Sequence, residues 1–215
     1  NYSTSYLFTS GPFQNAGFKA AYAFSDKVSL MAGIFNDNWN TYTANARTTE
    51  DGVEGEVSTF GAQLMVAPVT GWSAYVNFLT GPYSGTIIDL TTAYQITDAF
   101  KLGLNAADFS KPHDMGGYQG IALYPQFAVS SAVTLGLRGE YFKTKSYTFD
   151  DGQGEVEFAS ENVKAITVTA NIKAGPLTFI PEVRVDSWNT EIFSKKNGDP
   201  TKSASQFVLA AVYAF

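Results

Sequence analysis

The sequence predicts an all-β fold, an antiparallel up-and-down transmembrane β-barrel with about twelve strands. Segments of roughly ten residues alternate apolar and polar side chains, which is the length that a tilted strand needs to cross a bilayer. The connections between these segments are alternately short and long, as in barrels whose two ends face different compartments. Charged residues make up only 16% of the chain, whereas soluble domains average about 25%. The three observations together favour a barrel surrounded by lipid.

The expected strands follow one another along the whole chain. They occupy residues 2–10, 17–25, 27–36, 58–68, 71–80, 86–96, 100–107, 117–129, 133–143, 163–172, 177–187 and 204–215. The last of them is the most characteristic, because large apolar residues line one side, small residues line the other, and the strand ends on an aromatic residue. Residues 1–215 are expected to form a single β-barrel domain, with the C-terminal part of a larger barrel as the alternative.

Short turns and long loops alternate between the expected strands. The short turns lie at residues 25–27, 69–71, 97–99, 130–132 and 174–176, and the main long loops at 37–57, 108–116, 144–162 and 188–203. In outer-membrane barrels the short turns face the periplasm and the long loops face outward. With an even number of strands, the first and last would run antiparallel, so the ring could close without an unpaired edge.

The two faces of each strand differ, so the side that faces lipid can be predicted. Aromatic residues recur at the strand ends beside the short turns and indicate an interfacial girdle. The predicted girdle consists of Phe24, Trp72, Tyr94, Phe100, Phe127, Tyr213 and Phe215. The opposite face mixes small polar residues with a few charges of both signs, unlike the Lys- and Glu-rich surface of a soluble protein. We therefore expect the polar face to surround a water-filled lumen.

Composition excludes several other classes of protein. No run of 18 apolar residues exists, so a helical membrane span is not expected. Cysteine is absent, which removes disulfides and thiolate metal sites. The net charge is −6 and no Lys/Arg stripe is present, which argues against a nucleic-acid partner.

One block of sequence resembles a known family. The run Tyr2-Ser-Thr-Ser-Tyr-Leu-Phe8, then Gly11-Pro-Phe13, and the stretch from Ser25-Asp-Lys27 to Trp39 are similar to the central region of the outer-membrane β-barrel porins called OmpL-like. The resemblance covers about residues 2–39 and implies a porin-like barrel in the bacterial outer membrane. Family members usually carry further strands before this block, so the chain is either a fragment or a shorter relative that closes on itself.

Charged residues on the polar faces are the main functional candidates. The predicted pore-lining residues are Lys19, Asp89, Lys101, Arg138, Glu140, Glu182, Arg184 and Asp186. Such charges either line a water-filled pore and bias which solutes enter, or pair across a narrow lumen and plug it. About twelve strands lie between the small barrels filled by side chains and the larger ones that hold an aqueous channel. We expect a narrow or partly obstructed pore.

The sequence favours no catalytic site and no cofactor. The one histidine, His113, lies in an expected loop, and no nucleophile motif of the G-x-S-x-G type is present. Asp150, Asp151 and Glu155 are weak candidates for a Ca²⁺ site, because carboxylates are suitable ligands but their spacing differs from an EF-hand loop. An acidic solvated loop explains them better.

The leading functional hypothesis is an outer-membrane, porin-like channel for passive diffusion of small hydrophilic solutes. Its expected partners are the lipid bilayer and small polar solutes, with a homo-oligomer or a larger envelope complex left open. The alternative is a non-conducting structural or interaction barrel in a larger outer-membrane assembly. A third class, a soluble all-β binding protein, requires the polar face to point outward.

Overall fold

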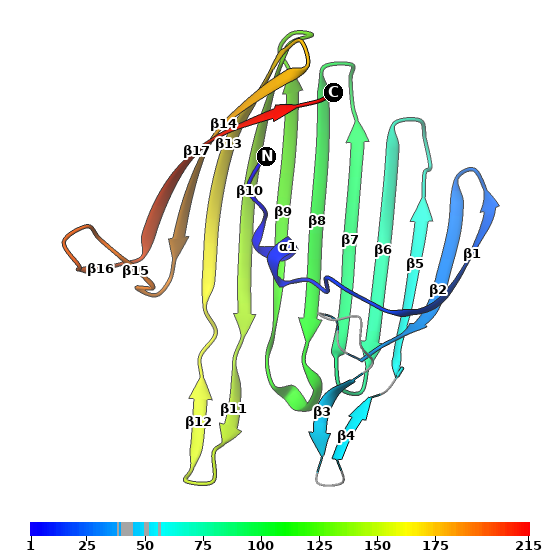
Figure 1. Ribbon diagram of the computed structural model, residues 1–215, viewed down its shortest axis with the longest axis vertical. Coiled ribbons are helices and arrows are strands. Elements are labelled where there is room, and N and C mark those ends of the chain that lie inside the picture. The colour runs from blue at the N-terminus through cyan, green and yellow to red at the C-terminus, as the bar shows by residue number, and fades with distance from the viewer. Residues whose placement is uncertain (38, 40–44, 50–51, 56) are drawn as a thin grey trace.

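The computed structural model describes residues 1–37, 39, 45–49, 52–55 and 57–215. Its main feature is an antiparallel sheet of eleven strands, in which each strand pairs with the next one along the chain (Figure 1). The strands of this sheet are β1 (Gly17–Ser25), β2 (Val28–Phe35), β5 (Thr59–Val66), β6 (Trp72–Gly81), β7 (Gly85–Gln95), β8 (Phe100–Ser110), β9 (Gly117–Ala128), β10 (Val133–Lys145), β13 (Asn162–Ala174), β14 (Leu177–Trp188) and β17 (Ser203–Tyr213). The up-and-down order confirms the predicted fold class, and these eleven strands lie within a few residues of their expected positions.

Three small hairpins lie within the long connections. They are β3 (Asn45–Thr49) with β4 (Gly52–Gly55), β11 (Tyr147–Asp150) with β12 (Glu155–Phe158), and β15 (Phe193–Ser194) with β16 (Pro200–Thr201). The short turns lie at the upper end of the sheet in Figure 1, and the β3–β4 and β11–β12 hairpins extend from the opposite end. The sequence predicted loops here and did not predict these hairpins. Of the expected loop 37–57, residues 38, 40–44, 50–51 and 56 lie outside the described residues.

The prediction of a strand at residues 2–10 is wrong. This stretch contains a short helix, α1 (Tyr6–Ser10), inside a segment that crosses one face of the sheet (Figure 1). Residues 1–16 are called the inward segment below. Ser5 caps the helix by accepting a hydrogen bond from Phe8 N over 3.1 Å, and Gly11 ends it. A Ser at the N-cap is an ordinary start of a helix, whereas the alternating pattern of these residues predicted a strand.

Loss of that strand changes how the barrel could close. Strands β1 and β17 are the two edges of the sheet, and within the described part of the chain neither pairs with a further strand. Because the sheet consists of eleven consecutive antiparallel strands, an odd number, its two edge strands β1 and β17 run in the same direction. The expectation that the first and last strands are antiparallel, and that twelve strands close the ring, is therefore not met by this sheet.

Strand register places side chains of similar polarity in rows on the same face of the sheet. Leu30 on β2 pairs with Leu64 on β5, which pairs with Val76 on β6, and this apolar row continues on one face. The other face carries the inward segment, and buried apolar residues concentrate where α1 packs against it. The face that carries the inward segment is called the inner face below, and the opposite one the outer face. Among the described helices, none has the length and apolar character needed to cross a membrane.

Candidate functional site: the inner face and its inward segment

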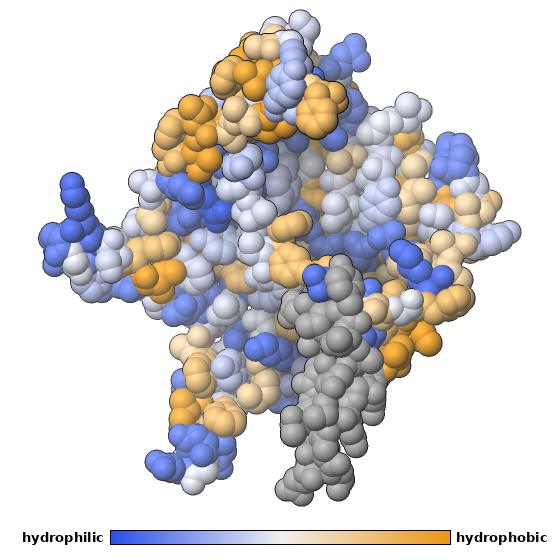
Figure 2. Space-filling view, in the orientation of Figure 1, coloured by the Kyte–Doolittle hydropathy of each residue, from blue (hydrophilic) through white to orange (hydrophobic). Residues whose placement is uncertain are grey.

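The inner face carries polar and charged side chains beside the apolar cluster under α1, whereas the outer face is apolar. Figure 2 shows the inner side of the molecule, where blue and pale residues mix with orange patches. On the outer face, large apolar side chains such as Leu137, Val168 and Leu209 are exposed. A sheet with exposed leucine and valine on one whole face needs an apolar medium around it, as the bilayer provides for a barrel.

Register places all eight predicted pore-lining residues on the inner face. Lys19, Asp89 and Lys101 lie on β1, β7 and β8, while the other five lie on β10 and β14. The two groups differ in what they contact. The charges on β10 and β14 bind one another or the inward segment, whereas Lys19 and Asp89 line a cavity beside it.

Glu182 anchors the start of the inward segment. Its carboxylate accepts hydrogen bonds from Tyr2 N over 2.6 Å and from Ser3 N over 2.9 Å. The hydroxyl of Thr169 donates a third hydrogen bond to this carboxylate, and the same hydroxyl accepts one from the Asn1 side chain. The side chain is almost fully buried, so these donors replace the water that a carboxylate otherwise requires. Glu182 therefore binds backbone N–H groups of the inward segment, which does not pair with a strand.

Arg138 and Glu140 form a second anchor, which is also buried. Arg138 Nε donates to Glu140 Oε1 over 2.6 Å, and both side chains are 2% exposed. The other guanidinium nitrogens donate to the backbone oxygens of Ser3 and Thr4, and Glu140 accepts from Tyr6 N over 2.8 Å. Each charge is thus paired and further hydrogen-bonded, which is the condition for keeping an ion pair inside a protein.

Arg184 adds a third polar contact. It donates to the backbone oxygen of Thr4 over 2.8 Å and forms an ion pair with Asp186 over 2.9 Å. Its guanidinium also lies 4.7 Å from the centre of the Tyr6 ring, which is within the range of a cation–π contact. The charges on β10 and β14 therefore hold the inward segment, a role that the sequence analysis did not predict.

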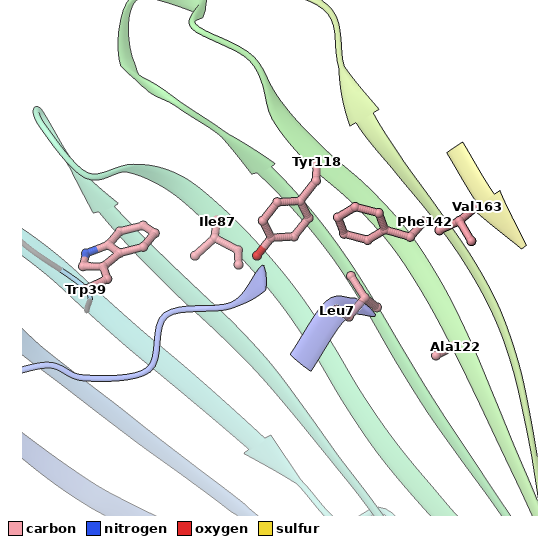
Figure 3. Close-up of a cluster of buried hydrophobic side chains, with 7 residues drawn as sticks. All are labelled: Leu7, Trp39, Ile87, Tyr118, Ala122, Phe142 and Val163. Atoms are coloured by element: carbon pink, nitrogen blue, oxygen red, sulfur yellow. The ribbon is translucent and has the colours of Figure 1, made fainter. Parts of the chain in front are cut away.

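Apolar contacts complete the anchoring. Leu7 of α1 is 5% exposed and packs with Tyr118, Phe142 and Ala122 on β9 and β10 (Figure 3). The Tyr6 ring stacks on Phe142 at 5.8 Å. Burial of a leucine contributes roughly 1.5 to 3 kcal/mol, so α1 has its own hydrophobic anchor besides the ionic one.

The predicted girdle residues on strands lie on the outer face near the short turns, and Phe215 follows the end of β17. Trp72 pairs with Tyr94, Phe100 pairs with Phe127, and Tyr213 stacks with Phe215. Phe24 lies at the end of β1, next to its turn. The indole nitrogen of Trp72 donates to Thr92 Oγ1 over 2.9 Å, so its polar group is satisfied while the ring is exposed. Their role as an interfacial girdle stays a prediction.

The weaker candidates of the sequence lie away from the inner face. His113 is exposed in the short helix η1 (Pro112–Asp114). Asp150 and Asp151 accept backbone hydrogen bonds from Gly152, Gln153 and Gly154, so they shape the β11–β12 turn. Glu155 follows on β12 and is exposed. Within the ranges that the structure describes, no three His, Cys, Asp or Glu residues are grouped closely enough to hold a metal ion.

Comparison with family models agrees with this architecture. The model of the family described as "Putative beta-barrel porin-2, OmpL-like" matches residues 1–215. The search of solved structures matched a loop L8 deletion mutant of OmpT, an outer membrane protein of Vibrio cholerae, with 14% sequence identity and a TM-score of 0.48. The match covers 91% of this chain and 61% of that one. Comparison with curated protein sequences gave no match.

Proposed function

Because the chain belongs to the family of OmpL-like β-barrel porins, we propose that it is a channel through which small hydrophilic solutes diffuse passively. The protein is an outer-membrane barrel of the bacterial envelope and contacts the lipid bilayer. The proposal requires no cofactor and no chemical step. It treats residues 1–215 as one barrel domain or as the C-terminal part of a larger barrel.

One observation carries the proposal. The inward segment is anchored on β9, β10, β13 and β14, while a cavity of about 630 Å³ lies between it and the inner face, where β1, β2 and β5 to β9 contribute lining residues. The inward segment therefore narrows the lumen on one side and leaves space on the other. Lys19 and Asp89 line this space and carry charge of opposite sign, so they are proposed to bias the passage of ions.

If the protein is a channel, we expect steady ohmic current steps when the purified protein is added to a planar lipid bilayer. Replacing Lys19 with glutamine removes a positive charge from the lining and is expected to raise the cation-to-anion permeability ratio. The matched control is Lys27→Gln, because Lys27 lies in the β1–β2 turn and its replacement should leave the ratio unchanged. An equal change in both variants would contradict the assigned lining.

The second candidate function is a non-conducting structural barrel within a larger assembly. The buried ion pair of Arg138 with Glu140 favours it, because a segment held this firmly could close the lumen completely. A folded, heat-modifiable protein that gives no current in the bilayer experiment would support this candidate. Copurification with other envelope proteins would then identify its assembly.

A further inference from the structure

The cavity beside β5 to β8 has the size of a ligand-binding site. Its volume of about 630 Å³ lies within the range of pockets that hold small organic molecules, about 300 to 1,000 Å³. One wall consists of strand residues on the inner face, and the other consists of residues from the inward segment. The two walls differ in chemistry.

The strand wall carries a row of four hydrogen-bonded polar side chains, one from each of β5, β6, β7 and β8. Gln63 Nε2 donates to Asn77 Oδ1 over 2.7 Å, and Asn77 Nδ2 donates to Asp89 Oδ1 over 2.7 Å. From the other side, Asn105 Nδ2 donates to Asp89 Oδ2. An amide has two N–H groups and an oxygen that accepts two hydrogen bonds, so the row retains further hydrogen-bonding capacity. The mutual contacts also fix the side chains before any ligand arrives.

The opposite wall is mainly apolar and aromatic, with Asn15 as its polar residue. Phe8 and Phe13 contact each other edge to face, with 5.8 Å between ring centroids, and the two residues are 61% and 54% exposed. Pro12 also belongs to the cavity lining. Both rings lie on the inner side of the sheet and not on the face that contacts lipid. Exposed aromatic rings on a polar inner side are therefore available to a solute.

The charge of the cavity favours an uncharged ligand. Among its described lining residues, Lys19 and Asp89 carry formal charges of opposite sign. The carboxylate of Asp89 accepts hydrogen bonds from the two asparagines and from Thr91 Oγ1, all of which are neutral donors. A cation and an anion are each attracted by one group and repelled by the other, whereas a neutral molecule meets only hydrogen-bonding groups and an apolar wall.

We propose that this cavity is a recognition subsite for a neutral polyhydroxylated solute of the sugar type. The hydroxyl groups of such a solute bind the polar row from Gln63 to Asn105, and its C–H face packs against Phe8 and Phe13. The subsite rests on the proposed function, because a channel brings the solute to the cavity. It adds to that function the chemical class of the solute.

Calorimetric titration with maltose tests the subsite directly. The whole protein is folded in a zwitterionic alkyl detergent, because a detergent with a sugar headgroup would compete. We expect saturable binding that Asp89→Ala weakens about tenfold or more, since hydrogen bonds to a charged group are the strong ones. Phe13→Ala provides a second test, because it leaves the polar row intact and removes only an exposed ring. Asn171→Leu is the matched control, as Asn171 is an inner-face amide on β13 outside the cavity lining.

The outcomes separate the subsite from the channel. Absence of saturable binding, or equal binding by wild type and both cavity variants, would overturn the subsite. Binding of spermidine in place of maltose would overturn the neutral class of solute. Conductance in the bilayer without maltose binding would support the channel and overturn this subsite. Maltose binding by a protein that never conducts would support the subsite and contradict the channel.

Discussion

Replacing Arg138 with methionine is expected to lower the free energy of unfolding by about 3 to 5 kcal/mol, because it leaves the buried Glu140 without its partner. The change also removes the donors to Ser3 O and Thr4 O, which hold the inward segment. The inward segment should then detach from the inner face for part of the time. We therefore expect larger and noisier single-channel currents than in the wild type, together with a lower midpoint of urea unfolding.

The matched control for Arg138→Met is Lys101→Met. Both changes remove one positive charge from the inner face, but the structure gives Lys101 no ion pair with a described residue. Lys101→Met should shift ion preference while leaving stability and current noise near the wild-type values. If the two variants lost stability equally, charge alone would explain the effect and the anchor would be disproved.

The strands of the main sheet could be predicted because their local pattern and their environment agree. On β8, Leu102 and Leu104 alternate with Lys101 and Asn105, and register with β7 and β9 places the two pairs on opposite faces. A bilayer around the outer face and polar groups on the inner face both stabilise this alternation on every strand. Strand pairs such as these are fixed by period and turn length, both of which can be read from one sequence.

The stretch at residues 2–10 could not be predicted in the same way, because its partners are distant in sequence. Its side chains alternate as in a strand, yet the carboxylates of Glu140 and Glu182 satisfy backbone N–H groups that a neighbouring strand would otherwise bind. These contacts span between 134 and 180 residues of chain. The local signals for the helix, Ser5 before it and Gly11 after it, were present but weaker than the alternation.

The candidate site was predicted in part. Alternation correctly assigned Arg138 and Asp89 to the same inner face, since a side chain's face depends only on strand register. Their different environments depend on where the inward segment lies, and that position is a tertiary property. The polar row was missed for a related reason. Gln63, Asn77 and Asn105 are neutral residues on different strands, and only register places them beside Asp89.

Placing arginine at Leu137 is expected to lower the free energy of unfolding by roughly 2 to 4 kcal/mol, because the charge must enter the bilayer from the outer face. Leu137 is 42% exposed on that face and pairs with Val168 on β13. Urea titration of the protein in phospholipid vesicles, followed by tryptophan fluorescence, measures the loss. The cost should fall in detergent micelles, which adapt to a charge more easily than a bilayer does.

The control variant is Thr134→Arg on the same strand. Thr134 pairs with Asn171 on the inner face, so an arginine there enters the polar interior and should cost much less. Asn105 would be a poor control, because its amide binds Asp89 and its replacement would break the polar row. Equal losses at Leu137 and Thr134 would mean that the two faces meet the same medium. Unequal losses of the expected sign would establish that lipid covers the apolar face, and this is the condition under which the polar face can line a channel.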